Sequence, residues 1–308
     1  MTATAPAEGV CVITTAWNHV DETLACLASI EAQDYPDITI LLVDNGSTDN
    51  TAGQVRARHP QVEIISLPEN LGPTRGYNAG FRRALEKGSG WLFLVNNDTV
   101  LAPDCVRQLL AEGYEAADVG LLMPKIYYAA EPERIWSVGG WENPRSLEVI
   151  RPGADELDRG QWEQALDLDD IPFCAVMIRR ATLEKVGLPD ETFFLYYEDR
   201  DFSRRAKQAG YRLRLAPAAK VWHAVSTSSG GQDSPQERYW VARSGMLFMR
   251  KNARSRRHWL TAVPLRAVAA ARTSLRLLRR GRLDSLRAYW RGLWHGLLDL
   301  VRARLGRA

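Results

Sequence analysis

The sequence predicts an α/β domain with a mixed, Rossmann-like sheet flanked by helices, followed by a basic amphipathic helical appendage. Short apolar segments alternate with helical patterns over the first hundred residues, which is typical of βαβ units. The charge changes sign near Met249: Arg250–Ala308 carries 16 Lys/Arg against 2 Asp/Glu, whereas the preceding residues carry 24 against 35. We therefore expect a main domain over residues 1–249 and a tail with different partners over residues 250–308.

The first hundred residues contain four apolar segments that we predict to be strands. They are Val10–Thr14, Ile38–Val43, Val62–Ser66 and Trp91–Val95. A helical pattern over about Glu22–Ala32, with Asp21 as its N-cap, separates the first two strands. A glycine-rich loop over Leu71–Gly80 is expected to lead into a helix around Phe81–Glu86.

The second part of the main domain continues the alternation around a long irregular segment. Ala129–Asp170 is rich in Gly, Pro and charge and predicts long loops over a cleft. The expected strands are Gly120–Ile126, Phe173–Ile178 and a stretch between Arg212 and Trp222. The expected helices run from after Pro103 to about Gly113, around Ala181–Val186 and over Glu198–Ala209.

Size and composition limit the classes of protein. The chain has 308 residues, and 45% of them are hydrophobic, as in a globular protein. No run of about 18 uncharged apolar residues predicts a membrane-spanning helix, and no secretory signal is visible at the start. Four widely spaced cysteines predict buried, reduced thiols in a cytosolic protein; they are Cys11, Cys26, Cys105 and Cys174.

Polar side chains follow the predicted strand Trp91–Val95 at the point where it ends. Asn96, Asn97 and Asp98 can bind cations or sugars, and function in open α/β sheets collects beyond the carboxyl ends of strands. Asp98 offers an oxygen ligand for Mg²⁺ or Mn²⁺, and His223 is a second candidate ligand. The alternatives are an ordinary Asx turn and a structural histidine.

Two further carboxylate groups have candidate roles. Asp44 ends a predicted strand and could accept the imide N–H of a uracil or thymine ring, although turn chemistry alone also explains it. Tyr196–Asp201 brings three carboxylates to a predicted helix start, where negative charge is favoured. One of them could take a proton from an attacking sugar hydroxyl, and helix stabilisation is the alternative.

Together these pieces resemble the family 2 glycosyltransferases, in particular bacterial rhamnosyltransferases of surface-polysaccharide assembly. The resemblance runs from about Val10 to Met249 and rests on an ordered set of motifs. They are TTAWN, LLVDNGSTDNT, ENLGPTRGYNAG, FLVNNDT, IWSVGG, the stretch from VMIRR through YYEDRD to GYRL, and VWHAVSTSSG. The resemblance implies the A-type glycosyltransferase fold, an inverting reaction and a divalent metal, Mg²⁺ or Mn²⁺.

The family's site residues carry over by position. Asp199 falls where the catalytic base lies, and Glu198 would contact sugar or acceptor. Asp98 corresponds to the surviving carboxylate of the D-x-D metal motif, with Asn96 in place of its first aspartate, so weaker metal binding or a larger role for His223 is implied. The residues matched to nucleotide binding are Thr15, Ala16, Trp17, Asp44, Asn45, Arg75, Asn78 and Asn97. Those matched to the sugar and acceptor cleft are Trp136, Gly139, Gly140 and Phe173.

Two departures from the family pattern lie near the expected pocket. Pro73-Thr74-Arg75 stands where relatives commonly have small residues, and Phe173 occupies a position that is often glycine. The transferred sugar is therefore not fixed as rhamnose by the resemblance.

The tail predicts an amphipathic helix. Its apolar positions recur at helical spacing and are Leu286, Trp290, Leu293, Trp294, Leu297, Val301 and Leu305. Arg287, Arg291, Arg302 and Arg304 lie largely outside this stripe, a pattern that suits an anionic membrane surface. The alternative is packing on the main domain or on a second copy in a homodimer. No base-stacking platform is recognisable, so nucleic acid is not an expected partner.

The resulting hypothesis is a cytoplasmic inverting glycosyltransferase at the inner face of the cell membrane. It would move a sugar from a nucleotide-diphosphate donor, with dTDP-rhamnose as the leading candidate, to a lipid-linked glycan acceptor. Two alternatives remain: a non-catalytic sugar-nucleotide-binding or scaffold protein of a polysaccharide complex, and a nucleotidyltransferase on a similar sheet.

Overall fold

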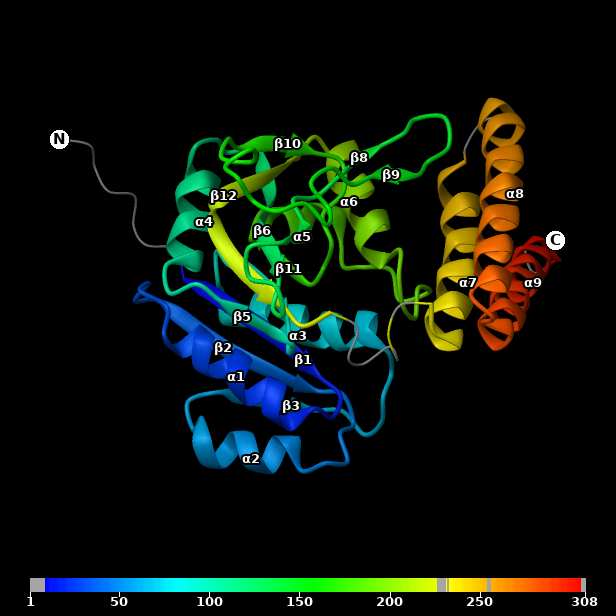
Figure 1. The fold of residues 1–308 in the computed structure, drawn as a ribbon. Helices are drawn as coiled ribbons and strands as arrows, with labels where there is room; N and C mark the ends of the chain where they lie inside the picture. Colours follow the sequence, from blue (N-terminus) through cyan, green and yellow to red (C-terminus); the bar gives the residue numbers. More distant parts are fainter. Residues whose placement is uncertain (1–8, 226–230, 232, 254–255, 306–308) are drawn as a thin grey trace.

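A mixed sheet occupies the centre of the main domain (Figure 1). The computed structural model describes residues 9–225, 231, 233–253 and 256–305. Within these ranges the sheet has ten strands, with the order β10-β12-β6-β11-β4-β1-β2-β3, and β5 and β7 pair with β12 and β6. The strands are β1 Val10–Ala16, β2 Ile38–Asp44, β3 Glu63–Ser66, β4 Trp91–Asn96, β5 Thr99–Leu101, β6 Val119–Tyr128, β7 Ile135–Ser137, β10 Leu166–Leu168, β11 Ala175–Arg179 and β12 Arg212–His223.

Helices cover this sheet and extend beyond it. Those of the main domain are α1 Val20–Glu31, α2 Thr51–Arg58, α3 Pro73–Lys87, α4 Cys105–Tyr114, α5 Arg180–Val186 and α6 Glu198–Gln208. Three longer helices follow, α7 Pro235–Asn252, α8 Arg256–Arg279 and α9 Leu283–Leu305, and Figure 1 shows them beside the sheet. The arrangement confirms the predicted mixed sheet flanked by helices with a helical appendage.

The register of the parallel strands brings three predicted site segments to one edge. β1 pairs in parallel with both β2 and β4, so Ala16 lies opposite Asp44 and Thr15 lies opposite Asn96. Most residues of the central strands are buried, and the four cysteines are buried free thiols, as the sequence predicts. The polar residues after β1, β2 and β4 therefore meet where the apolar strands end.

Two sequence expectations on the first helices are wrong. Asp21 is not the N-cap of α1, because the helix already begins at Val20 and His19 is the N-cap. Leu71–Gly80 is not a loop, because α3 begins at Pro73. A Cβ on Gly80 would lie 2.4 Å from Ile13 Cγ2, so this glycine allows α3 to pack closely on β1 and is not a sign of a loop. The helix α2 had no counterpart in the sequence expectations.

The segment predicted as irregular is largely so, but it contributes four short strands. β7 and β10 join the main sheet, and β8 (Trp141–Glu142) pairs with β9 (Val149–Ile150) in a separate ribbon. The predicted helix Glu198–Ala209 is confirmed as α6. The loop after β10 lies beside α6, because the Ile171 N–H donates to Ser203 Oγ at 3.3 Å and Arg200 Nε lies 3.8 Å from Asp170 Oδ1. Backbone hydrogen bonds between Gly140 and Asp170 hold this loop from the other side.

The C-terminal helices form a unit with its own small apolar core. Ala242 of α7, Ala270 and Leu277 of α8, and Tyr289 of α9 form this cluster. The buried Asp233 lies just before α7 and forms ion pairs with Arg276 and Arg280, each at 2.9 Å. These ion pairs join the start of α7 to α8 and the residue that follows it. The predicted boundary at Met249 lies inside α7. No helix in the described part of the chain is long and apolar enough to cross a membrane.

Candidate active site

The ends of β4 and β12 bring Asp98 and His223 together. Asp98 Oδ1 lies 3.2 Å from His223 Nε2, and each side chain is only 7% exposed. The indole of Trp136 packs edge-on against the imidazole, with ring centres 4.8 Å apart. Burial alone would lower the pKa of His223, but Cys174 and Asp98 raise it to about 10. Residues 125 positions apart in the chain thus form one polar pair at the sheet edge.

This pair fits a divalent cation that takes part of its coordination from elsewhere. A carboxylate oxygen and an imidazole nitrogen are ligands of Mn²⁺ and related ions. Because the pKa of His223 is raised to about 10, its imidazole would have to release a proton when the ion binds. Among the described residues no group of three or more His, Cys, Asp and Glu forms a complete site. Mg²⁺ and Mn²⁺ at diphosphates commonly use one or two protein ligands together with phosphate oxygens and water, so an incomplete protein set is compatible with such an ion.

The second carboxylate group begins α6. Asp199 is half-buried, and burial and the charge of Asp170 raise its pKa to about 6. Arg151 and the backbone N–H of Arg200, which donates to Asp199 Oδ1 at 2.8 Å, act in the opposite direction. Burial and the charge of Asp199 hold the pKa of Glu198 well above its usual range. The arrangement therefore favours a proton on Glu198 and an ionised Asp199 at neutral pH.

Asp98 and Asp199 lie around the same buried side chains. After burial, both carboxylates are among the charges that raise the pKa of the Cys174 thiol and of the Tyr77 hydroxyl. Electrostatic influence on a common group requires proximity, because such effects fall with distance. Packed rings connect the two segments: the Tyr77 hydroxyl lies 3.4 Å from Asn96 Oδ1 at the end of β4, and Phe173 packs between Tyr77 and Phe202 of α6, although about a hundred residues separate β4 from α6.

Three residues predicted for the nucleotide lie at the carboxyl ends of β1 and β2. Ala16 and Asp44 are buried opposite each other, and Asp44 Oδ1 accepts the backbone N–H of Ser47 at 3.0 Å. Thr15 Oγ1 is buried and has no hydrogen-bond partner. Trp17 follows directly and is 39% exposed, which leaves part of its ring available to a flat ligand.

The other predicted nucleotide residues are engaged within the protein. The Asn45 amide bonds Asn70, Leu71 and Gly72 and fixes the loop before α3. Arg75 is exposed on α3 with its Nε 3.6 Å from Glu191, and the Asn78 amide donates to Glu191 and to Pro189 O. Asn97 Nδ2 donates to Thr23 Oγ1 at 3.0 Å. These contacts support the loops around the site.

The remaining predicted residues pack against neighbouring side chains of the main domain. Asn96 Oδ1 accepts the Tyr77 hydroxyl at 3.4 Å. Phe173 is buried between the rings of Tyr77 and Phe202. A Cβ on Gly139 would lie 2.4 Å from Leu168, and one on Gly140 would lie 2.4 Å from Val149, so both glycines allow close backbone packing.

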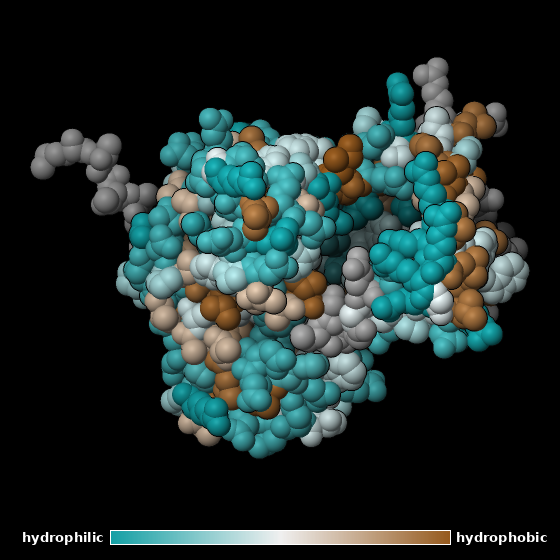
Figure 2. All heavy atoms as spheres, viewed as in Figure 1, coloured by the Kyte–Doolittle hydropathy of each residue, from teal (hydrophilic) through white to brown (hydrophobic). Residues whose placement is uncertain are grey.

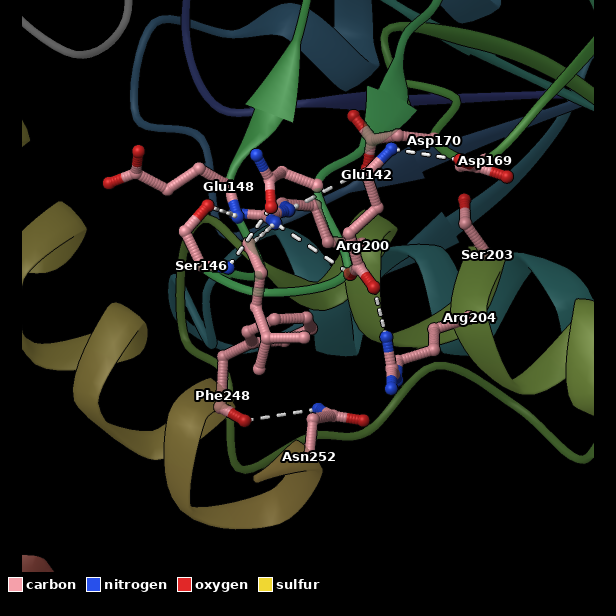
Figure 3. A network of polar contacts seen from close by, with 12 residues as sticks. Glu142, Ser146, Glu148, Asp169, Asp170, Arg200, Ser203, Arg204, Phe248 and Asn252 are labelled. Carbon is pink, nitrogen blue, oxygen red and sulfur yellow. Dashed lines mark hydrogen bonds and ion pairs between the residues drawn. The ribbon is translucent and has the colours of Figure 1, made fainter. Parts of the chain in front are cut away.

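Sequence reasoning missed the charges that surround the start of α6 (Figure 3). Arg200 bonds Leu147 O, and its Nε lies 3.8 Å from Asp170 Oδ1. Arg151 donates to Asp170 Oδ2 at 3.3 Å. Arg200 is also stacked on Phe248 of α7, with the guanidinium carbon 4.7 Å from the ring centre. The position of Arg200 inside the motif YYEDRD could have indicated its role in the sequence, whereas Arg151 and Asp170 stand in no recognisable motif.

Comparison with known proteins identifies the family. The sequence pattern of Glycosyl transferase family 2 matches residues 11–186, more than half of the chain. The chain belongs to glycosyltransferase family 2. It is accordingly a glycosyltransferase, and the matched region contains β1, β2 and β4 with the polar residues that follow them.

Relatives and solved structures agree with this assignment. The N-acetylglucosaminyl-diphospho-decaprenol L-rhamnosyltransferase of Mycobacterium tuberculosis is 26% identical over 227 residues, which cover 66% of this chain and 72% of the relative. The dTDP-rhamnosyl transferase RfbF of Shigella flexneri is 22% identical, covering 69% and 71%. The mannosyltransferase PcManGT of Pyrobaculum calidifontis, solved with GDP-Man and Mn²⁺, matches with a TM-score of 0.57 and 18% identity over 97% of this chain and 87% of that one. The last match shows the fold alone.

Proposed function

We propose that this glycosyltransferase moves rhamnose from dTDP-rhamnose to a hydroxyl of a lipid-linked glycan, with inversion at the anomeric carbon. The observation that carries the proposal is the Asp98–His223 pair at the sheet edge, which the packed rings of Tyr77, Phe173 and Phe202 connect to α6, the helix that begins with Glu198 and Asp199. Two relatives whose names contain rhamnosyl transfer support the donor, and one of those names also contains a diphospho-decaprenol acceptor.

In the proposed reaction Asp199 removes the proton from the acceptor hydroxyl. The hydroxyl oxygen forms a bond to the anomeric carbon while the bond from that carbon to the diphosphate oxygen breaks, and dTDP leaves. A base with a pKa near 6 is ionised at neutral pH and remains basic enough to accept this proton as the new bond forms. Glu198, kept neutral by its surroundings, can donate a hydrogen bond to sugar or acceptor.

The residues at the other end of the site would hold the donor. Asp98 and His223, with Asn96 beside them, are the proposed ligands of Mg²⁺ or Mn²⁺, which would neutralise charge on the leaving diphosphate. Thr15, Ala16, Trp17 and Asp44 would contact the nucleoside, with Asp44 accepting the thymine imide N–H. Asn45, Arg75, Asn78 and Asn97 would act on the nucleotide through the loops that they support.

The acceptor side of the site is proposed to lie between Trp136 and the start of α6. Trp136 covers His223, and the backbone of Gly140 bonds Asp170, whose charge acts on Asp199. Gly139 packs on Leu168 beside it. Phe173 would act as the floor of the pocket, because its ring lies between Tyr77 and Phe202. A glycan entering over Trp136 would then meet the base at the sheet edge.

We also propose that the C-terminal unit contacts the inner face of the cell membrane and leaves the main domain in the cytoplasm. Figure 2 shows apolar residues along α8 on the face of the C-terminal unit that is in view, where Leu260, Val263, Leu265, Val268 and Leu275 are exposed. Trp290 and Trp294 of α9 are 53% and 58% exposed, while Leu286 and Leu293 of the same predicted stripe pack inward. The side chains of Val301 and Leu305 lie outside the described residues, as do those of Arg302 and Arg304. Exposed tryptophans beside Arg287 and Arg291 suit an anionic lipid surface.

Transfer from a panel of nucleotide sugars to a lipid-linked acceptor tests the function directly. The wild-type enzyme should release dTDP and form a rhamnosylated product of inverted configuration. Asp199→Asn should lose almost all transfer and keep its affinity for dTDP, because the amide fills the same space but cannot accept the proton. Full activity of Asp199→Asn would exclude this base, and transfer only from another nucleotide sugar would exclude rhamnose.

A further inference from the structure

The segment that leads into α6 carries two consecutive residues with a left-handed backbone. Tyr196 has a φ of 65°, and Tyr197, the N-cap of α6, has a φ of 72°. Bulky residues rarely adopt this conformation, and each instance costs about 1–3 kcal/mol unless the surroundings hold it. Because Glu198 and Asp199 follow directly, the contacts that hold this backbone also determine where the carboxylate of Asp199 points.

Helix α7 holds this segment from one side. Ser244 Oγ donates to Leu195 O at 2.8 Å. The ring of Phe248 packs on the ring of Tyr197, with centres 5.4 Å apart. A Cβ on Gly245 would lie 3.1 Å from the Tyr197 hydroxyl oxygen, so the glycine leaves room for that hydroxyl. These contacts of α7 with Leu195 and Tyr197 therefore depend on the left-handed conformation of the segment before α6.

Helix α8 supplies a cation at the same place. Arg266 Nη1 donates to the Tyr197 hydroxyl at 3.2 Å, and the guanidinium carbon lies 5.7 Å from the ring centre. Although burial raises the pKa of Tyr197, Arg266 and Arg200 lower it below its usual value. Arg266 Nε and Nη2 are buried without a hydrogen-bond partner. The hydroxyl of Tyr197 is therefore the principal polar contact of a guanidinium that is costly to bury.

We propose that Arg266 is a positioning residue for sugar transfer: its contact with the Tyr197 hydroxyl fixes the left-handed backbone from which α6 presents Asp199. The inference rests on the proposed role of Asp199 as the base. It makes α8 of the C-terminal unit part of the arrangement that sets the reaction geometry, in addition to any contact of that unit with lipid.

The test compares Arg266→Gln and Tyr197→Phe with a matched control, Arg272→Gln, an exposed arginine of the same helix. With a soluble acceptor, both test variants should lower kcat about 10- to 100-fold, since small misplacement of a reacting group has effects of this size. The KM for the donor should not change, because Asp98 and His223 are untouched. Arg266→Lys should recover part of the loss, and Arg272→Gln should match the wild type.

The pH profile separates positioning from a direct electrostatic effect. The largest charge effects on the pKa of Asp199 come from Asp170, Arg151 and Arg200, with the adjacent Glu198 coupled to it, and Arg266 is not one of these. The acidic limb of kcat should therefore keep its midpoint in Arg266→Gln while the plateau falls. A shifted midpoint with an unchanged plateau would overturn the inference.

Amide hydrogen exchange gives a readout that does not depend on turnover. Exchange in Leu195–Asp199 should be faster in Arg266→Gln than in the wild type and unchanged in Arg272→Gln. Wild-type kcat and wild-type exchange in Arg266→Gln would overturn the positioning role and leave the proposed function intact. Absence of transfer by the wild-type enzyme would instead contradict the proposed function, and the exchange measurement would still decide whether Arg266 holds the segment.

Discussion

His223 Nε2 lies 3.2 Å from Asp98 Oδ1 at the meeting point of β12 and the turn after β4. We expect both side chains to bind the divalent ion that accompanies the donor diphosphate. Asp98→Asn and His223→Ala should each abolish most of the rise in melting temperature that Mn²⁺ causes in the presence of dTDP, because the ligand set loses one member. The loss of kcat should be about 10²–10³-fold for Asp98→Asn, the size seen when one stabilising group of a transition state is removed.

Thermal shifts with dTDP but without metal provide the control for this prediction. They should be the same in the wild type and in both variants, because Asp44 and Trp17 lie at the neighbouring strand ends. An unchanged response of Asp98→Asn to Mn²⁺ would place the ion elsewhere.

The raised pKa of Asp199 predicts the pH dependence of transfer. The base works only when ionised, so kcat should be low in acid, rise through pH 6 and level off above it, with the midpoint at the pKa of about 6. Asp170→Asn removes a negative charge that raises this pKa and should move the midpoint to lower pH. Arg151→Gln removes a positive charge that lowers it and should move the midpoint to higher pH. Equal midpoints in the three proteins would show that another group controls the acidic limb.

The hydrogen bonds of Asn45 predict a measurable loss of stability when this residue is replaced. Its amide makes three hydrogen bonds to the segment Asn70–Gly72, so Asn45→Ala leaves buried groups unpaired and should lower the free energy of unfolding by about 1–3 kcal/mol. Asn70→Ala should cost less, because Asn45 keeps its bonds to Leu71 and Gly72. Denaturant unfolding of both variants measures the order, and the reverse order would contradict the proposed role of Asn45.

The exposed tryptophans of α9 predict binding to anionic vesicles. The double variant Trp290→Ser, Trp294→Ser should lose most cosedimentation with phosphatidylglycerol vesicles and keep its activity on a soluble acceptor, because both side chains point away from the small core of the C-terminal unit. The pair Leu278→Ser and Leu283→Ser replaces exposed apolar residues at the α8–α9 turn and tests whether binding extends there. Vesicle binding that survives in the tryptophan variant, or a wild-type dimer that it converts to a monomer, would favour a protein interface.

Much of the fold could be predicted from the sequence because its central strands are short, apolar and separated by recognisable turns. The apolar run Trp91–Val95 marked β4, and the acidic start at Glu198 marked α6. Gly76 and Gly80 misled the prediction of α3: glycine usually signals a loop, but here the missing side chains allow contact with Thr15 and Ile13. The N-cap of α1 was missed because His19 adopts a left-handed backbone without a capping side chain.

The candidate site was predictable only where its residues stand in motifs. Asp98 and Asp199 follow recognisable signals, a strand end and a helix start. Asp170 and Arg151 lie in the irregular segment. The loop that carries Asp170 is held by its pairing with Gly140, a long-range contact without a local pattern, and Arg151 in turn bonds Asp170. Asn45 illustrates the opposite case, since a residue inside a recognisable motif uses its side chain to hold a loop.

Helix α7 runs without interruption from the apolar core of the C-terminal unit to the start of α6. Its residue Ala242 belongs to that core, whereas Ser244 and Lys251 bond Leu195 and Asp201. One continuous helix, α7, thus joins the C-terminal unit, which is proposed to contact lipid, to the start of α6, which carries the proposed base. Tilting of α8 and α9 against a bilayer would therefore move the carboxylate of Asp199 through α7. The depth to which the C-terminal unit is immersed and the rate of glycan extension should then vary together.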